Sequence, residues 1–392
     1  MLSRWLGLLA AGLLLAGCAT PARPEIRARI DPAATLSNGD AGFARALAPR
    51  PFVFPRDHGP HPEYQIEWWY YTGNLSAGER QFGYQLTFFR SGLAPRPVAR
   101  ESAWGATGVY MAHLALSDVA RGRFYAYERF SRDAAGLAGA SGDPFRVFLE
   151  DWSAAGSGPE GMTMHLRAAE GEVALDLILE SQKPPALQGN QGLSQKGPTP
   201  GNASFYYSLT RMLTTGTIRV DGQTYAVGGL SWMDHEWGTS ALEAGAVGWD
   251  WFSLQLDDGY DLMYAQVRTP TSVSYSFGSL VDPAGRVTPL DPAEVQLEVL
   301  ATWRSPASQA LYPARWRLSV PGLALRLELE PRLANQELPV SVVYWEGAVR
   351  IQGSRQGQPV TGSGFVELTG YATGRGGAPG ARSRIPAVVG YR

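Results

Sequence analysis

Apolar and polar residues alternate along several stretches of this chain, and the alternation argues against a mainly helical fold. It runs from Phe82 to Phe88, from Val173 to Leu179, and from Trp316 to Leu329. A period of two is typical of strands that bury one face, because successive side chains point to opposite sides of a sheet. Only residues 292–303 are ambiguous between helix and strand. The sequence therefore predicts an all-β protein.

Turn signals separate these stretches. Asp221-Gly222 lies between two β-prone runs, 217–220 and 224–227, and predicts a two-residue hairpin. The 46 glycines and 28 prolines among 392 residues suit a turn-rich β protein. The Gly-, Pro- and Gln-rich segment 184–201 predicts a long loop, and such loops are often functional. About 340 residues of meandering strands predict two barrels or sandwiches, with a boundary near residue 240.

The charge balance and the cysteine count exclude several classes of function. Lys and Arg total 34 against 36 Asp and Glu, so the formal net charge is −2. A nearly neutral chain lacks the basic surface that binds nucleic acid, and no nucleic-acid partner is predicted. One cysteine excludes a disulfide framework, an iron–sulfur cluster and a Cys-rich zinc site. The sequence also lacks a nucleotide-binding glycine motif, and we predict no cofactor.

That cysteine, Cys18, lies at the end of a typical lipoprotein signal. Arg4 is followed by an apolar run from Leu6 to Leu15, and residues 15–18 read Leu-Ala-Gly-Cys. We therefore predict a signal peptide over 1–18, lipidation of Cys18, and a tether over 19–50. Several acyl chains on Cys18 would anchor the protein to a membrane without a spanning segment. The predicted location is the bacterial cell envelope, at the outer membrane facing the periplasm.

Two stretches place ionisable groups between large aromatic residues. The first is 67–75 (EWWYYTGNL); the second is 229–238 (GLSWMDHEWG), followed by 248–252 (GWDWF). Burial among aromatic rings shifts pKa values, and an imidazole beside two carboxylates is a plausible acid or base. The structural alternative is that these clusters plug the end of a barrel, each acid accepting a hydrogen bond from an indole N–H. Both interpretations remain open at this point.

Metal binding and serine hydrolysis find less support. Asp234, His235 and Glu236 are potential ligands in a row, but in a strand only the first and third share a face. Nothing in the sequence itself brings His58 or His61 close to His235, so no metal site is predicted. Ser194, His235 and Asp234 are the residue types of a catalytic triad, but the chain has no G-x-S-x-G motif to support a serine hydrolase.

Five segments together resemble the AttH/lipocalin-like family of secreted bacterial proteins, which includes the carotenoid 1,2-hydratases and has been described as predicted secreted hydrolases. They are 67–75, the 188–197 loop, 204–208, 232–238 and 364–371. The resemblance runs from about Phe52 to the C-terminus. It implies two tandem lipocalin-like antiparallel β-barrel domains, over 51–240 and 241–392, with an apolar cavity between or within them.

The resemblance also implies roles for particular residues. His235 and Trp237 match the hydratase His and Trp, and Tyr264 matches its Tyr. The hydratase acid would fall two residues later, where this chain has Gln266. An amide cannot protonate an alkene, so another acid would have to replace it. The candidates are Asp234, Asp250 and Glu236, provided that they point into the cavity.

From these observations we predict an envelope lipoprotein that binds a hydrophobic small molecule, a lipid or an isoprenoid, in an aromatic-lined cavity. An envelope transport system is a further candidate partner. The alternative is a carotenoid 1,2-hydratase-like enzyme that adds water to a C=C bond, or a secreted hydrolase. The predicted ligand-binding residues are Glu67, Trp68, Trp69, Trp232, Trp249 and Trp251. The predicted catalytic residues are Asp234, His235, Trp237 and Tyr264.

Overall fold

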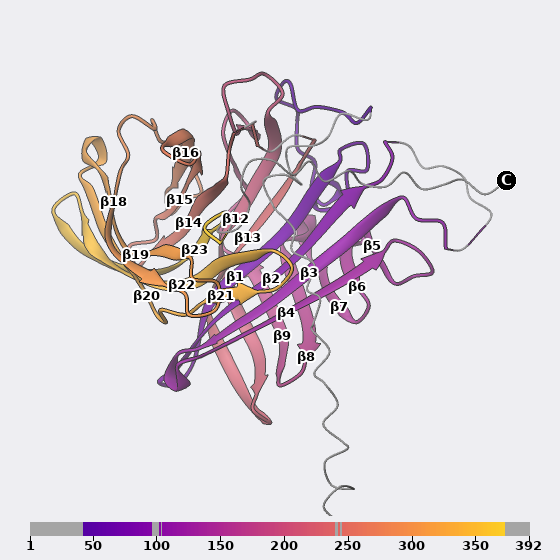
Figure 1. The fold of residues 1–392 in the computed structure, drawn as a ribbon, viewed down its shortest axis with the longest axis horizontal. Coiled ribbons are helices and arrows are strands. Elements are labelled where there is room, and N and C mark those ends of the chain that lie inside the picture. The colour runs from indigo at the N-terminus through magenta and orange to yellow at the C-terminus, as the bar shows by residue number, and fades with distance from the viewer. Residues whose placement is uncertain (1–41, 96–101, 103, 240–241, 244, 373–392) are drawn as a thin grey trace, which may run out of the picture.

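The structure, a computed structural model, consists of two antiparallel β-sheets that lie against each other (Figure 1). It describes residues 42–95, 102, 104–239, 242–243 and 245–372. Each sheet curves around its own apolar core, as expected for two lipocalin-like barrels in tandem. The prediction of an all-β fold is confirmed. Cys18, the signal peptide and most of the tether lie outside the described residues.

The first sheet has 13 strands in the order β4-β3-β2-β1-β13-β12-β9-β8-β7-β6-β5, with β10 and β11 paired to β12. Its strands are β1 (Ile66–Ala77), β2 (Arg80–Gly92), β3 (Gly108–Asp118), β4 (Arg123–Arg132), β5 (Ala138–Gly142), β6 (Phe145–Leu149), β7 (Trp152–Ser157), β8 (Thr163–Glu170), β9 (Val173–Ser181), β10 (Ala186–Leu187), β11 (Leu193–Gln195), β12 (Ala203–Val220) and β13 (Gln223–Gly238).

The second sheet has 10 strands in the order β17-β16-β15-β14-β23-β22-β20-β19-β18, with β21 paired to β22. Its strands are β14 (Gly248–Leu256), β15 (Asp261–Arg268), β16 (Val273–Val281), β17 (Val287–Pro289), β18 (Gln296–Arg304), β19 (Leu311–Val320), β20 (Leu325–Pro331), β21 (Glu337–Pro339), β22 (Val343–Arg355) and β23 (Gln358–Leu368). Four short 3-10 helices complete the described elements: η1 (Arg56–His58), η2 (Val119–Arg121), η3 (Pro159–Gly161) and η4 (Pro321–Leu323).

The alternation seen in the sequence sets which face of each strand is buried. In β9, Val173, Leu175, Leu177 and Leu179 are buried in the first core, and the residues between them are more exposed. The predicted Asp221-Gly222 hairpin joins β12 to β13, with Val220 paired to Gln223. Both turn residues have positive φ, 51° and 75°, which is the geometry that favours Asp-Gly in a two-residue turn.

The long loop at 184–201 contacts both sheets. Its short strands β10 and β11 pair with β12. At its start, Lys183 Nζ lies 2.7 Å from Asp261 Oδ2 of the second sheet. Further along, Ser279 Oγ donates to the Gln188 side-chain oxygen at 2.7 Å. The loop therefore ties the two sheets together.

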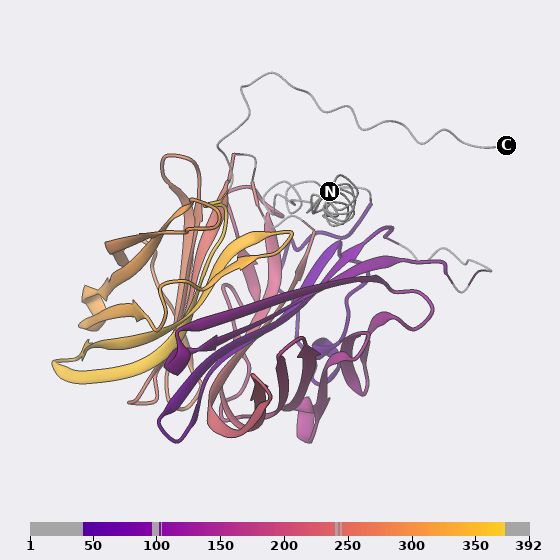
Figure 2. The same cartoon turned by 60° about the horizontal axis from the view of Figure 1, so that its bottom comes forward.

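The two sheets pack through faces that point away from their own cores (Figure 2). A third cluster of buried residues fills this contact, contributed by both sheets: Tyr70, Tyr206, Trp232, Trp251, Met263, Ala265, Ala348 and Phe365. Many central strands are consequently covered on both faces. No helix among the described residues is long and apolar enough to cross a membrane.

Candidate functional site

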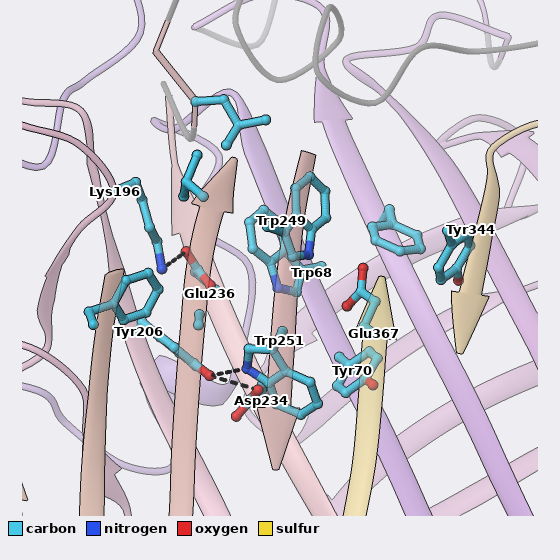
Figure 3. Close-up of a pocket in the computed structure, with 15 residues that line it drawn as sticks. Trp68, Tyr70, Lys196, Tyr206, Asp234, Glu236, Trp249, Trp251, Tyr344 and Glu367 are labelled. Carbon is cyan, nitrogen blue, oxygen red and sulfur yellow. Dashed lines mark hydrogen bonds and ion pairs between the residues drawn. The ribbon is translucent and has the colours of Figure 1, made fainter. Parts of the chain in front are cut away.

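A cleft opens between the two sheets, next to the buried contact cluster (Figure 3). Its first chamber has a cavity volume of about 120 Å³. Strands of both sheets supply the lining, which is mostly aromatic: Trp68, Tyr70, Phe89, Lys196, Tyr206, Asp234, Glu236, Leu242, Trp249, Trp251, Ala265, Val267, Phe277, Tyr344 and Glu367. In the view of Figure 3, the three indole rings lie between Asp234 and Glu236 on one side and Glu367 on the other.

Strand alternation explains why these residues share the cleft. On β13, Asp234 and Glu236 face it, while His235 and Trp237 face the first core. On β14, Trp249 and Trp251 face it, while Phe252 lies in the second core. Because the period is two, the cleft takes every second residue of each strand.

Asp234 is a buried acid that receives three hydrogen bonds. Tyr206 Oη donates at 2.7 Å, Ser208 Oγ at 2.6 Å and Trp232 Nε1 at 2.7 Å. Burial raises the pKa of Asp234 to about 7, even though the three hydrogen bonds act to lower it. A substantial fraction of Asp234 is therefore protonated at neutral pH, and its ionised form has donors ready to stabilise it.

Glu236 differs from Asp234 because it is paired with a cation. Lys196 Nζ lies 2.8 Å from Glu236 Oε1, and Ser204 Oγ donates to the same oxygen. The Lys196 ammonium also lies 4.3 Å from the ring centroid of Phe277 and 4.8 Å from that of Tyr206. Glu236 therefore serves as the counter-ion of Lys196.

Glu367 is a second acid whose pKa is raised. Burial, reinforced by the charges of Asp234 and Glu236, raises the pKa of Glu367 to about 8 against a hydrogen bond from Trp249. Directly opposite it on β22 is Glu346. Burial and the charge of Glu367 raise the pKa of Glu346 well above its ordinary value. The raised pKa values favour the neutral form of both carboxyl groups.

A second chamber adjoins the first and has a cavity volume of about 240 Å³. The two chambers share five lining residues: Trp68, Phe89, Trp249, Tyr344 and Glu367. The rest of the second chamber is lined by apolar side chains, among them Val109, Met111 and Phe130, and by polar ones such as Arg90 and His113. Together the chambers form an extended, largely apolar cleft with a few acids, as small-molecule sites commonly do.

The structure brings four of the ten predicted ligand-binding and catalytic residues into the first chamber. They are Trp68, Trp249, Trp251 and Asp234. Trp232 lies behind them, 2% exposed, and contributes its N–H to Asp234. Of the three acids considered as replacements for the hydratase acid, Asp234 and Glu236 line the cleft. Asp250 instead bonds Gln266 and Arg268.

The other predicted residues lie elsewhere. His235, Trp237 and Trp69 are fully buried in the first barrel, where His235 stacks on Trp69 at a centroid distance of 4.9 Å. Glu67 contributes to the lining of the second chamber, but its carboxylate is engaged by His235, His61 and Arg90.

Tyr264 belongs to the second core and is separated from His235 by the cleft and its walls. Gln266 is also directed away from the cleft, toward Asp250, with its Nε2 2.8 Å from Asp250 Oδ2. The four positions matched to the hydratase pattern are therefore divided between two barrel interiors. Ser194 receives a hydrogen bond from Lys196, and His235 bonds Asp57 and Glu67, so no Ser-His-Asp triad is assembled among the described residues.

Several cleft residues were not singled out from the sequence. The most informative are Glu367, Tyr206 and Lys196, each of which lies inside a segment that carries the family resemblance. Counting every second residue from Asp234 and from Trp251 would have identified the residues of those two strands that face the cleft. It could not have identified the partner strands, because the cleft joins sheets that are distant in sequence.

Comparison with known proteins agrees with this architecture. The crystal structure of an AttH protein from Nitrosomonas europaea is 34% identical, with a TM-score of 0.75, over 84% of this chain and 100% of that one. Kievitone hydratase from Nectria haematococca has a TM-score of 0.63 over 85% of this chain and 98% of that one. At 16% identity the second likeness shows the fold alone.

Two curated relatives match about half of this chain. Kievitone hydratase of Fusarium solani subsp. phaseoli is 23% identical over 209 residues, 51% of this chain and 58% of the relative. The quinolone epoxide rearrangement protein penF of Penicillium thymicola is 26% identical over 222 residues, 53% of this chain and 59% of the relative. The matches thus span less than two thirds of either relative. A model of the AttH-like family matches residues 45–371, which is most of the two-sheet body, and the chain belongs to that family.

Proposed function

We propose that this protein is a hydratase-like enzyme that protonates a C=C bond of an apolar substrate held in the cleft between the two sheets. The observation that carries the proposal is Asp234, an acid with a pKa of about 7 that lines the same chamber as three indole rings. An acid is most effective as a proton donor when its pKa lies near the working pH. Two relatives carry names for hydration and epoxide rearrangement, which supports chemistry of this class here.

In the proposed reaction, the Asp234 carboxyl group transfers its proton to one alkene carbon, and the π bond supplies the electron pair for the new C–H bond. The other carbon becomes a carbocation. A water molecule adds to that carbon through its oxygen, and the proton it releases returns to the Asp234 carboxylate. The net change is addition of one water, and the acid is regenerated.

The lining of the cleft supports both halves of this reaction. After proton transfer, the hydrogen bonds from Tyr206, Ser208 and Trp232 stabilise the Asp234 carboxylate. The electron-rich faces of indole and phenol rings stabilise a nearby cation. The second chamber offers apolar room for the remainder of an elongated substrate. We place no reacting group on His235, Trp237 or Tyr264, whose predicted catalytic roles remain predictions.

Binding without turnover is the second candidate, favoured by the mainly apolar lining of the second chamber. In this proposal the protein carries a lipid or isoprenoid in the bacterial envelope, anchored through acyl chains on Cys18. Envelope anchoring is compatible with either activity. Labelling of growing cells with an alkyne fatty acid should tag the wild type and leave Cys18→Ser untagged.

One experiment distinguishes the hydratase from the carrier, and it uses small molecules extracted from the cells that produce this protein. Their apolar extract is incubated in H₂¹⁸O with the wild type, with Asp234→Asn, or without protein, and is examined by mass spectrometry. A product that is one H₂¹⁸O heavier than its precursor, formed by the wild type only, would support the hydratase. A molecule that copurifies unchanged with both proteins would support the carrier. Equal product formation by Asp234→Asn would overturn the role of Asp234.

A further inference from the structure

A cluster of metal-binding side chains lies in the first barrel, outside the cleft chemistry proposed above. His61 Nδ1, Glu67 Oε1 and His235 Nε2 all lie within 4.8 Å of one another, and all three residues are buried. The shorter distances are 2.9 Å from His61 Nδ1 to Glu67 Oε1 and 3.0 Å from His235 Nε2 to the same oxygen. Three potential ligand atoms thus converge on one point.

The outer contacts of the two histidines orient these atoms as ligands. His235 Nδ1 lies 3.0 Å from the carbonyl oxygen of Asp57, which accepts but cannot donate a hydrogen bond. His61 Nε2 lies 3.3 Å from Asp57 Oδ1, also an acceptor. When each of these nitrogens carries the ring proton, the other nitrogen of the neutral imidazole presents its lone pair to Glu67. Histidine ligands of metals are commonly oriented by such contacts.

The Glu67 carboxylate is also oriented by hydrogen bonds from neighbouring residues. Arg90 Nε donates to Glu67 Oε2 at 2.8 Å, and the backbone N–H of His61 donates to the same oxygen at 3.0 Å. Glu67 Oε1 faces two imidazole nitrogens, and if both present lone pairs, a positive charge is needed between them. Either additional protons or a single divalent cation can supply that charge. A divalent ion that displaces two protons leaves the net charge of the cluster unchanged.

We propose that His61, Glu67 and His235 bind a divalent transition-metal ion, with Zn²⁺ as the reference ion. Two imidazoles and one carboxylate suit Zn²⁺ and its neighbours in the first transition row, whereas Mg²⁺ and Ca²⁺ prefer oxygen ligands. Bonds of about 2.0–2.1 Å to Zn²⁺ require the two nitrogens to move toward each other around the ion. His61 lies in the segment before β1, outside the paired strands that hold Glu67 and His235.

The position of the three ligands indicates what the ion does. His61 comes from the segment before β1, Glu67 from β1 and His235 from β13. The ion would fasten that segment to the two strands whose opposite faces present Trp68, Asp234 and Glu236 to the cleft. We therefore assign it a structural role, in which metal binding stabilises the folded wall of the cleft.

The test uses the full-length protein unfolded with a chelator, refolded, and supplied with Zn²⁺ or Mg²⁺. Native mass spectrometry and metal analysis should find one zinc per chain, no stoichiometric magnesium, and a higher melting temperature with zinc. His61→Gln and His235→Gln should each weaken zinc binding more than about 10-fold. His58→Gln is the matched control, because His58 is buried in the same segment but bonds Tyr207 and Glu160 instead. It should retain wild-type zinc binding.

Two results would overturn the proposal: a refolded wild type that takes up no stoichiometric zinc, or equal zinc binding by His61→Gln, His235→Gln and the wild type. X-ray absorption of the cobalt- or zinc-loaded wild type provides a test that needs no variant. Two imidazole nitrogens and at least one oxygen around the ion would support the assignment. Coordination by oxygen alone, or by one histidine, would place the ion at a surface site such as His165 and Asp176.

Discussion

Glu346 and Glu367 face each other across the β22–β23 pair, and Tyr70 Oη donates a hydrogen bond of 2.5 Å to Glu346 Oε1. Two ionised carboxylates at opposed positions in an apolar contact would repel each other and lose hydration. The pKa of each is accordingly raised by burial, that of Glu367 to about 8. Neutral Glu367 makes the junction of the two chambers compatible with an apolar ligand.

The affinity of the cleft for a neutral apolar molecule should therefore fall as the pH rises through about 8, the pKa of Glu367. Above that pH, ionisation places a charge beside the ligand, and affinity should drop by up to about tenfold per pH unit. Fluorescence titration with N-phenyl-1-naphthylamine at several pH values measures this. Glu367→Gln should remove the fall near pH 8 and leave only the dependence set by Asp234 near pH 7, and the exposed control Glu298→Gln should keep the wild-type profile. A pH profile unchanged in Glu367→Gln would contradict the prediction.

Asp234 should make the protein less stable as the pH rises from about 4 to about 7. Its pKa is about 7 when folded, against an ordinary value of 3.8, so the folded state binds more protons in this window. The stabilisation is complete below the unfolded pKa and is lost as the pH rises through the folded one. Urea unfolding of Asp234→Asn should show a shallower slope over this range. The exposed control Asp291→Asn should keep the wild-type slope, and a wild-type slope in Asp234→Asn would refute the pKa assignment.

Arg90 should be among the most important polar residues for the stability of the first barrel. It holds the buried Glu67 carboxylate at 2.8 Å and also donates to the carbonyl oxygens of His61 and Tyr64. Replacing one partner of a buried ion pair costs about 3–5 kcal/mol, because the remaining charge is uncompensated. Urea unfolding of Arg90→Met in the presence of a chelator measures this loss.

The matched control is Arg317→Met on the second sheet. Arg317 pairs with Glu328 and Glu298, and its side chain is 28% exposed against 6% for Arg90. Exposed pairs contribute about 1 kcal/mol or less. If both variants lose the same small amount, the buried network does not stabilise the barrel.

The strands and the β12–β13 hairpin were predictable because their signals are local. Alternation over Val173 to Leu179 needs only one buried face, and Asp221-Gly222 needs only the backbone preference of its own two residues. The aromatic segment at the start of β1 behaved differently. Residues 68–71 are apolar or aromatic without interruption, because this strand is covered on both faces.

That double coverage is why the sequence could not place the candidate site completely. Asp234 and His235 are adjacent and both buried, so no difference in polarity identifies which one faces the ligand. The sequence grouped them together, and the structure separates them across the sheet. Glu367 and Lys196 reach the cleft through pairings between distant strands and through the loop at 184–201, which single-sequence periodicity does not contain.

The junction of the chambers provides a last prediction, on the indole of Trp249. This ring lines both chambers and donates a hydrogen bond to Glu367. Trp249→Ala should weaken binding of an apolar molecule by about 10- to 100-fold, because a buried aromatic contact contributes about 1.5–3 kcal/mol. Trp249→Phe keeps an aromatic face without the N–H and should retain most of the affinity.

Isothermal titration with the same neutral naphthylamine gives the affinities, with Trp104→Ala as the control for removal of an indole. Trp104 is 67% exposed and does not line either chamber, so its variant should bind like the wild type. If Trp249→Ala also binds like the wild type, the apolar ligand occupies another part of the molecule. A loss shared by Trp249→Ala and Trp249→Phe would instead assign the effect to what Phe lacks, the N–H that bonds Glu367 and the second ring of the indole.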